Sequence, residues 1–252
     1  MKNRPAPFTL CLAGDTNPGD TYQRRLAARG QENILLKHGY EFSFQHFRPI
    51  LDASHYRIVN LEVSLTDRTT SDLVDVKPYL DRTDPFSTGP LLNALSIDAV
   101  CLANNHTMDF GRAGLLDTIR NLDHAGIAWF GAGPDITEAA KVHHVRPDEL
   151  NAFLHLIFVS GFELRRNHID WNYYASEQDA GVNCWSKQNI QAQLSPIRKQ
   201  YPHAFIIAFP HWGSNYREVN DRQRGMAEAL VAAGVDLVLG HGSHAMQEIS
   251  RL

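Results

Sequence analysis

The chain has 252 residues, of which 43% are hydrophobic and 21% charged, which is the ordinary balance of a globular protein. The formal net charge is −4 and the Lys and Arg residues are scattered along the chain, so we expect no nucleic acid partner. No apolar run reaches the length that spans a membrane, and three unpatterned cysteines (Cys11, Cys101 and Cys184) favour a reducing compartment, so we expect a cytoplasmic protein.

Short apolar, β-rich runs alternate along the chain with helical patterns. The runs predict strands at 8–13, 57–63, 98–103, 127–130, 153–159, 204–209 and 236–239. Helices are predicted before residue 98, where Pro90 provides a start, and at 114–125 and 226–233, which Gly126 and Gly234 end. This alternation favours an α/β layered fold, a sheet covered by helices, as a single domain over residues 1–252.

Two segments show no clean period. Residues 165–186 are aromatic and polar, and we interpret them as a long surface insertion near the site. Within them, Trp171 to Trp185 is either a substrate-facing loop or a surface loop whose rings pack on the domain, and both interpretations stay open. Residues 66–84 form a similar irregular loop.

Polar side chains follow five of the apolar runs. In open α/β sheets the carboxyl ends of the strands form the crevice where ligands bind, so the five clusters can converge on one point. Their carboxylate, amide and imidazole groups are ligands that divalent metals take, and thiolates are absent. The clusters are Asp15–Asn17, Asn60–Glu62, Asn104–His106, His211–Trp212 and His241–His244.

Each cluster is weak by itself. An Asp at a strand end commonly serves a turn or a helix cap, and a single His near Pro and Trp is commonly structural. His241 and His244 are stronger, because two imidazoles on one short loop can share a metal. Since all five strand ends carry ligand-type groups, we predict a divalent metal site.

The motifs of this chain resemble those of a known family. The string LANNHTMDFGRAGLLDTIRNLDHAGIAWFGAG (102–133) resembles the bacterial capsule-synthesis family, which is CapA-like and linked to poly-γ-glutamate, as do the other strand-end clusters from Asp15 to about Glu248. That family is similar to calcineurin-like metallophosphoesterases, which hold two metals in a layered αββα sandwich. The resemblance implies this fold for the chain. The family continues into further strands beyond the last histidine motif, and this chain stops at Leu252, so whether the sandwich lacks its C-terminal strands stays open.

The resemblance also implies a role for individual residues. Asp15 and His244 would bind the first metal, and Asn105, His211 and His241 the second, with Glu62 where that fold has a bridging Asp and His106 facing the substrate. The chain departs from the phosphoesterase motifs: Asn17 stands where they have a His, and the last two histidines are separated by two residues rather than one. The number of metals, expected to be two, and their identity among Mn, Zn and Fe therefore stay open.

Two functions fit these residues. The first is a hydrolase in which metal-activated water attacks an amide or a phosphoester, with His106 as the catalytic group. The second is a non-catalytic component of a synthesis assembly that binds γ-glutamyl chains. An imidazole at His106 favours the enzyme. The substrate would be a γ-glutamyl polymer or a small acidic molecule, and Arg217 offers either a local positive charge for it or a solvated helix face. The candidate substrate-binding residues are Asn17, Asn60, Asn104, Trp212 and Arg217, and the oligomeric state is left open.

Overall fold

The structure is a computed structural model that describes residues 7–147 and 154–252. Its strands form two four-stranded sheets. The first sheet is parallel, in the order β1 (Leu10–Thr16), β2 (Tyr56–Leu61), β5 (Ala99–Cys101) and β6 (Ala128–Phe130). The second has the order β14 (Leu237–Val238), β13 (Phe205–Ala208), β9 (Leu156–Val159) and β8 (His143–Val145), and only β8 runs antiparallel to its neighbour.

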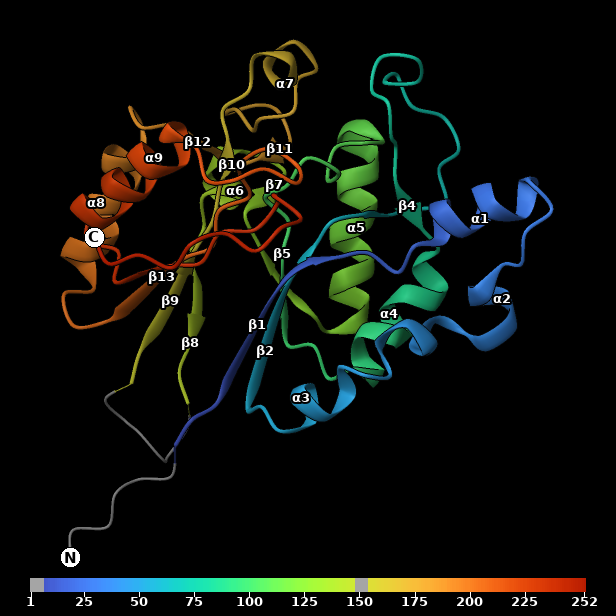
Figure 1. Ribbon diagram of the computed structural model, residues 1–252. Helices are drawn as coiled ribbons and strands as arrows, with labels where there is room; N and C mark the ends of the chain where they lie inside the picture. The colour runs from blue at the N-terminus through green and yellow to red at the C-terminus, as the bar shows by residue number, and fades with distance from the viewer. Residues whose placement is uncertain (1–6, 148–153) are drawn as a thin grey trace, which may run out of the picture.

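The two sheets lie face to face between two layers of helices (Figure 1). Ile58, Phe130, Phe158 and Ile207 belong to the apolar core between the sheets. Because successive side chains of a strand point to opposite faces, neighbours such as Val59 lie on the outer faces, under the helices. Strands buried on both faces must read as continuous apolar runs, which explains why the sequence shows runs rather than alternation.

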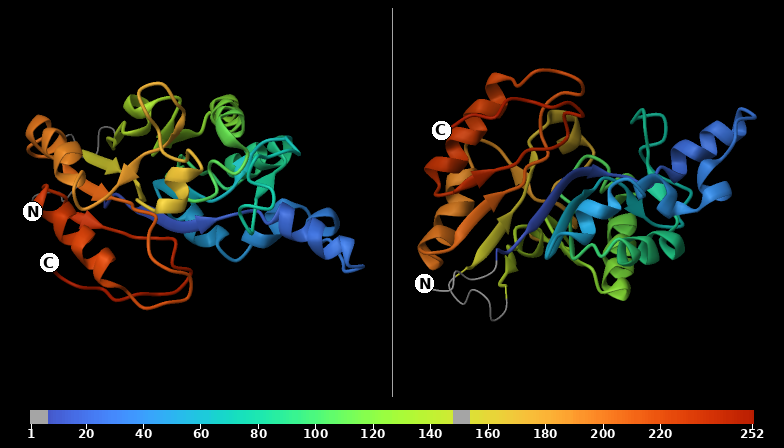
Figure 2. Two further views of the ribbon diagram at one scale, coloured as in Figure 1. Left: turned by 90° about the horizontal axis from the view of Figure 1, so that it is seen from above. Right: turned by 60° about the horizontal axis from the view of Figure 1, so that its bottom comes forward.

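Different helices cover the outer face of each sheet. Figure 2 shows the helices of the N-terminal half and those of the C-terminal half on opposite sides of the molecule. Leucines of α4 (Pro85–Ala94) and α5 (Gly111–Ala125) pack on the first sheet. Residues of α8 (Ile190–Gln200) and α9 (Asp221–Ala232) pack on the second. The predicted α/β sandwich is confirmed with an αββα layering, whereas its kinship to metallophosphoesterases stays a prediction.

Shorter elements connect these layers. No helix among the described residues is long and apolar enough to cross a membrane, and the cytoplasmic location stays a prediction. The remaining helices are α1 (Asp20–Ala28), α2 (Ile34–His38), the 3-10 helix η1 (Tyr40–Phe44), α3 (Arg48–Asp52), α6 (Ile136–Ala139) and α7 (Arg166–Asp170). Three two-stranded pairs join β3 (Ser64–Leu65) to β4 (Arg82–Thr83), β7 (Ala132–Gly133) to β11 (Gly181–Val182), and β10 (Phe162–Glu163) to β12 (Cys184–Trp185).

Helix starts were the least accurate predictions. Pro90 lies inside α4, which begins at Pro85 because the Asp84 carboxylate accepts hydrogen bonds from the first free backbone N–H groups. Likewise α9 begins five residues before Met226, where Asn220 and Gln223 form a capping box. The helix ends follow the prediction, since Gly126 takes the left-handed conformation after α5.

The segment 165–186 is exposed at 166–167, 169–170 and 176–179, and its rings take the second of the two interpretations left open above. Tyr173, Val182 and Trp185 have no exposed surface, and Tyr174 stacks on Phe162. The rings therefore pack into the domain, and this contradicts the substrate-facing interpretation. The aromatic residues of this segment show no helical or strand periodicity, because their rings do not share one face of a helix or strand. Each ring packs in a different place between elements.

Candidate metal centre

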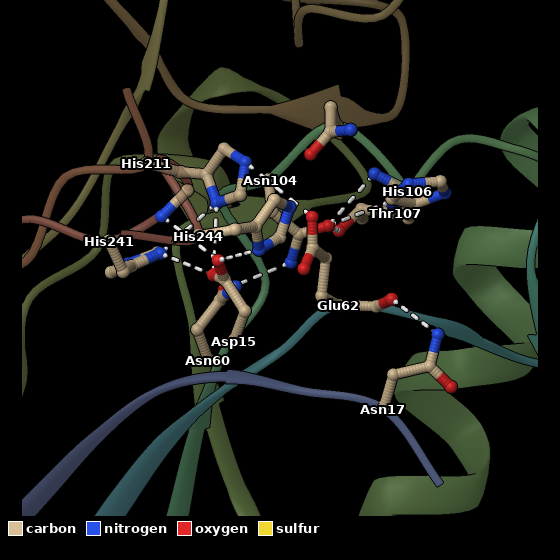
Figure 3. Close-up of polar contacts among 12 residues, drawn as sticks. Asp15, Asn17, Asn60, Glu62, Asn104, His106, Thr107, His211, His241 and His244 are labelled. Carbon is tan, nitrogen blue, oxygen red and sulfur yellow. Dashed lines mark hydrogen bonds and ion pairs between the residues drawn. The ribbon is translucent and has the colours of Figure 1, made fainter. Parts of the chain in front are cut away.

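Asp15 lies at the end of β1 and is the centre of the site. A bulge shifts the pairing between β1 and β2 after Ala13, so that Asp15 pairs with Asn60. One carboxylate oxygen of Asp15 lies 3.1 Å from Nδ1 of His241 and accepts a hydrogen bond from the Asn60 amide at 2.8 Å. The other oxygen lies 3.2 Å from Nδ1 of His244. Figure 3 shows these side chains turned toward Asp15.

The histidines come from the second sheet. His211 follows β13 and His241 follows β14, and both are buried with their Nδ1 atoms 3.1 Å apart. His211 also approaches Asp15, at 3.4 Å. His244 has a left-handed backbone, with φ at 51°, and its side chain is 31% exposed at the edge of a cavity. A side chain rarely takes this conformation without support, and here it turns the imidazole toward Asp15.

Glu62 follows β2 and is the second carboxylate of the site. It is buried, and its Oε1 lies 3.7 Å from Nε2 of His211. Two groups of potential ligands result, with the donor atoms of each group within 4.8 Å of one another: Asp15, His211 and His241, and Asp15, Glu62 and His244. Asp15 belongs to both groups, so two ions at this site would share its carboxylate.

The amide side chains of the site divide into two kinds. Oδ1 of Asn105 is buried without a hydrogen-bond partner, and a buried amide oxygen in this state fits a metal ligand. Asn60 and Asn104 are fully buried instead, and they bond to each other at 3.0 Å and hold Asp15 and the backbone of His106. They do not line the cavity, so the prediction that they contact substrate is wrong for both.

A cavity of about 330 Å³ opens beside the ligand groups. Its lining contains the predicted residues Asn17 and His106, together with Asp81, which the sequence analysis did not select. The lining consists of Asp15, Asn17, Glu62, Asp81, His106 and His244. With three carboxylates and no Lys or Arg in the lining, the cavity is acidic when it holds no cation.

His106 is held by residues that sequence reasoning missed. Its Nδ1 lies 2.7 Å from Oδ2 of Asp109, three residues further along the chain. Asp109 is fully buried and pairs with Lys77 from the irregular segment 66–84. The spacing of Asp109 from His106 was visible in the sequence, but nothing in segment 66–84 indicated that Lys77 would reach this place.

Trp212 and Arg217 also lie outside the cavity, as Asn60 and Asn104 do. Trp212 is buried in the core beneath α8 and α9, and a side chain at Gly240 would collide with its ring, at 2.2 Å from Nε1. Arg217 is exposed on the loop after His211 and does not line the cavity. Trp212 is therefore a packing residue, which corrects its assignment.

The charges of the site are unevenly distributed. Burial would raise the pKa of Asp15, but hydrogen bonds with His211, His241 and His244 hold it well below its usual range. Burial and the neighbouring Asp15 raise the pKa of Glu62 to about 7. Burial also lowers the pKa of His211 to about 3, so this imidazole is neutral at neutral pH and free to bind a metal.

The chain is similar in sequence to known proteins. A family model described as bacterial capsule synthesis protein PGA_cap matches residues 9–252. A probable polyglutamine synthesis accessory protein of Mycobacterium tuberculosis is 29% identical over 283 residues, covering 97% of this chain and 70% of that protein.

Two Bacillus proteins are also similar. The capsule biosynthesis protein CapA of Bacillus anthracis is 25% identical over 95% of this chain, and the PGA biosynthesis protein CapA of Bacillus subtilis is 28% identical over 89%. The chain spans 55% and 56% of the length of these two proteins, respectively.

Proposed function

The chain belongs to the bacterial capsule synthesis family that its motifs resemble, and we propose that it is a metal-dependent hydrolase. In this proposal a dimetal centre activates water for cleavage of an amide or a phosphoester. The relatives are named for capsule, PGA and polyglutamine synthesis, so we propose a γ-glutamyl polymer or a small acidic molecule as the substrate.

The observation that carries this proposal is the position of Asp15 in two ligand groups. The groups combine carboxylate oxygen with imidazole nitrogen, and the unpartnered amide oxygen of Asn105 adds a further donor. This donor set contains no thiolate and suits Mn, Zn or Fe.

Each residue has a distinct task in the proposed reaction. A divalent ion at the site would lower the pKa of a bound water and polarise the bond under attack. Asp15 and Glu62 would balance the charge of the ions, and the imidazoles of His211 and His241 would complete the set of ligands. His106 faces the cavity, where it can exchange a proton with the reacting groups.

The charge of the cavity restricts when an anionic substrate can bind. Asp15, Glu62 and Asp81 would repel a carboxylate of a γ-glutamyl chain in the metal-free protein. Two divalent ions would reverse the sign of the local charge. We therefore propose that metal binding precedes the binding of substrate, with Asn17 as a polar contact on the cavity wall.

The alternative is a non-catalytic component that binds γ-glutamyl chains. The mycobacterial relative is named an accessory protein, and this name favours a non-catalytic function. The acidic cavity disfavours it for a metal-free protein, because a polyanion would be repelled there.

The test begins with metal analysis of protein purified without chelator, followed by incubation with a γ-glutamyl oligomer and a generic phosphodiester. His241→Ala and His244→Ala should each lower the metal content, whereas the exposed His203→Ala serves as the matched control. Mn, Zn or Fe should also raise the free energy of unfolding by about 3 kcal/mol at a hundredfold excess over Kd. Absence of metal and of any stabilisation would refute the metal site, and metal-loaded protein that binds but does not cleave the oligomer would favour the alternative.

A further inference from the structure

Asp109 has a complete set of partners within the chain. It lies in the turn between β5 and α5 and has no exposed surface. Its Oδ2 lies 2.7 Å from Nδ1 of His106 and accepts a hydrogen bond from the backbone N–H of Asp81, also at 2.7 Å. Its Oδ1 accepts a hydrogen bond from the hydroxyl of Tyr173 at 2.7 Å and pairs with Lys77.

The partners of Asp109 come from the two irregular segments. Lys77 belongs to segment 66–84 and Tyr173 to segment 165–186, and both side chains are more than 90% buried. Lys77 also donates to the backbone carbonyl of Asn105. The hydroxyl oxygen of Tyr173 lies 2.7 Å from the same carbonyl and from Oδ1 of Asp109, so its one hydrogen serves either acceptor. Since neither side chain lines the cavity, their common effect is to fix the turn that carries Asn105 and His106.

The contact between Asp109 and His106 decides which ring nitrogen carries the hydrogen. The ion pair with Lys77 and the hydrogen bond from the backbone N–H of Asp81 stabilise the ionised form of the Asp109 carboxylate. An ionised carboxylate only accepts hydrogen bonds, so Nδ1 of His106 donates to Oδ2 of Asp109 at 2.7 Å. The Lys77 ammonium also lies 3.4 Å from this nitrogen, but the shorter contact to the carboxylate decides the assignment. In the neutral imidazole the hydrogen is then on Nδ1, and Nε2 keeps its lone pair.

We propose that Asp109, held by Lys77 and Tyr173, is a positioning residue that fixes His106 as the Nδ1–H tautomer with Nε2 available to the cavity. This inference rests on the proposed hydrolase function. Nε2 accepts the proton of the attacking water as the new bond to carbon or phosphorus forms. The same proton then passes to the leaving nitrogen or oxygen as the scissile bond breaks, so the imidazole returns to its starting state.

The first experiment reads the tautomer directly. Protein with ¹⁵N-labelled histidine, loaded with diamagnetic zinc, is examined by NMR at a pH where His106 is neutral, and His106→Gln assigns its signals. We expect a protonated Nδ1 and a bare Nε2, and a changed tautomer population in Asp109→Asn. Asp117→Asn is the matched control, because Asp117 is also a buried, ion-paired carboxylate, 2.7 Å from Arg68.

A protonated Nε2 in the wild-type protein, or an unchanged tautomer in Asp109→Asn, would overturn the proposal. This readout does not require turnover, so its failure differs from a failure of the proposed hydrolase function, which metal analysis and the cleavage assay report.

The second experiment is a kinetic double-mutant cycle on the best substrate. Asp109→Asn should lower kcat by about 10²-fold with little change in KM. In a His106→Gln background the same substitution should cause no further loss, because Asp109 acts through His106. An equal loss in both backgrounds would contradict this role. If Asp109→Asn alone does not fold because it leaves Lys77 unpaired, the cycle is repeated with Lys77→Met present throughout.

Discussion

The Asp15 carboxylate, 12% exposed, and the fully buried Asp109 carboxylate lie in the same region, but their charges are balanced differently. Asp109 pairs with Lys77, so the chain itself supplies a positive charge. Asp15 has imidazoles, an amide and a backbone N–H as partners, and no Lys or Arg among the described residues bonds to it. Glu62 adds a second carboxylate beside it.

This difference supports the proposal that Asp15, and not Asp109, takes an external cation. Burying a charge is costly unless it is paired, and Lys77 meets that need at Asp109. At Asp15 the neutral His211 cannot meet it, and burial together with the neighbouring Asp15 carboxylate raises the pKa of Glu62. Asp109 therefore belongs to a completed structural network, whereas Asp15 belongs to a site that a divalent ion would complete.

The largest effect should follow from neutralising Asp15. Asp15→Asn removes the carboxylate shared by both ligand groups, so we expect the loss of bound metal, of hydrolysis and of the stabilisation by added metal. Metal analysis and thermal unfolding with and without Mn, Zn or Fe measure these losses. Full metal content in the folded variant would show that Asp15 is not a shared ligand.

A substitution of Lys77 tests whether this residue balances the charge of Asp109. Lys77→Met leaves Asp109 buried without its cation, and we expect the free energy of unfolding to fall by about 3–5 kcal/mol. The double variant Lys77→Met, Asp109→Asn removes both charges and should recover most of that loss. Denaturant titration of the metal-free proteins measures both values. A double variant less stable than Lys77→Met would contradict the pairing.

His106 connects the two carboxylates to the chemistry. His106→Ala should reduce turnover by about 10²–10⁴-fold while metal content stays near normal, because His106 is not in either ligand group. The variant must fold, which circular dichroism checks. Full activity would remove His106 from the mechanism, and an unfolded variant would favour a structural role.

The smallest effect concerns pH. Glu62 has a pKa of about 7 in the folded protein, above its ordinary value of 4.5, so it contributes stability below pH 4.5 that is lost as pH rises through 7. For metal-free protein this loss should be about 3 kcal/mol. Glu62→Gln should flatten this dependence in unfolding experiments between pH 5 and 8. A Glu62→Gln profile parallel to the wild type would contradict the assignment.

The sequence predicted the strands better than what lies between them. The apolar run 204–209 forms β13 because a strand buried on both faces requires continuous apolar residues. The convergence of Asp15, Glu62 and the histidines on one place was also predictable, since parallel strands bring their carboxyl ends to one edge. Asn60 and Asn104 were assigned to substrate because the register that lets their amides bond across β2 and β5 is not visible in a single sequence.

The network around Asp109 was harder to predict. Lys77 and Tyr173 lie in segments without periodicity, and their positions depend on long-range packing rather than on local propensity. Asp109 itself follows His106 by three residues, but at that spacing an Asp is equally common as a cap or a turn residue. Only the folded arrangement shows that the three side chains meet.

The distance along the chain between the ligands has a consequence for folding. Asp15 and His241 make contact across 226 residues, so neither three-residue ligand group exists until both ends of the sequence have come together. Closing such a long loop is slow, because contacts between residues far apart in the sequence must overcome the entropy of loop closure. We therefore expect the ligand groups to form late in folding. An ion held there would connect β1 to the loop that follows β14.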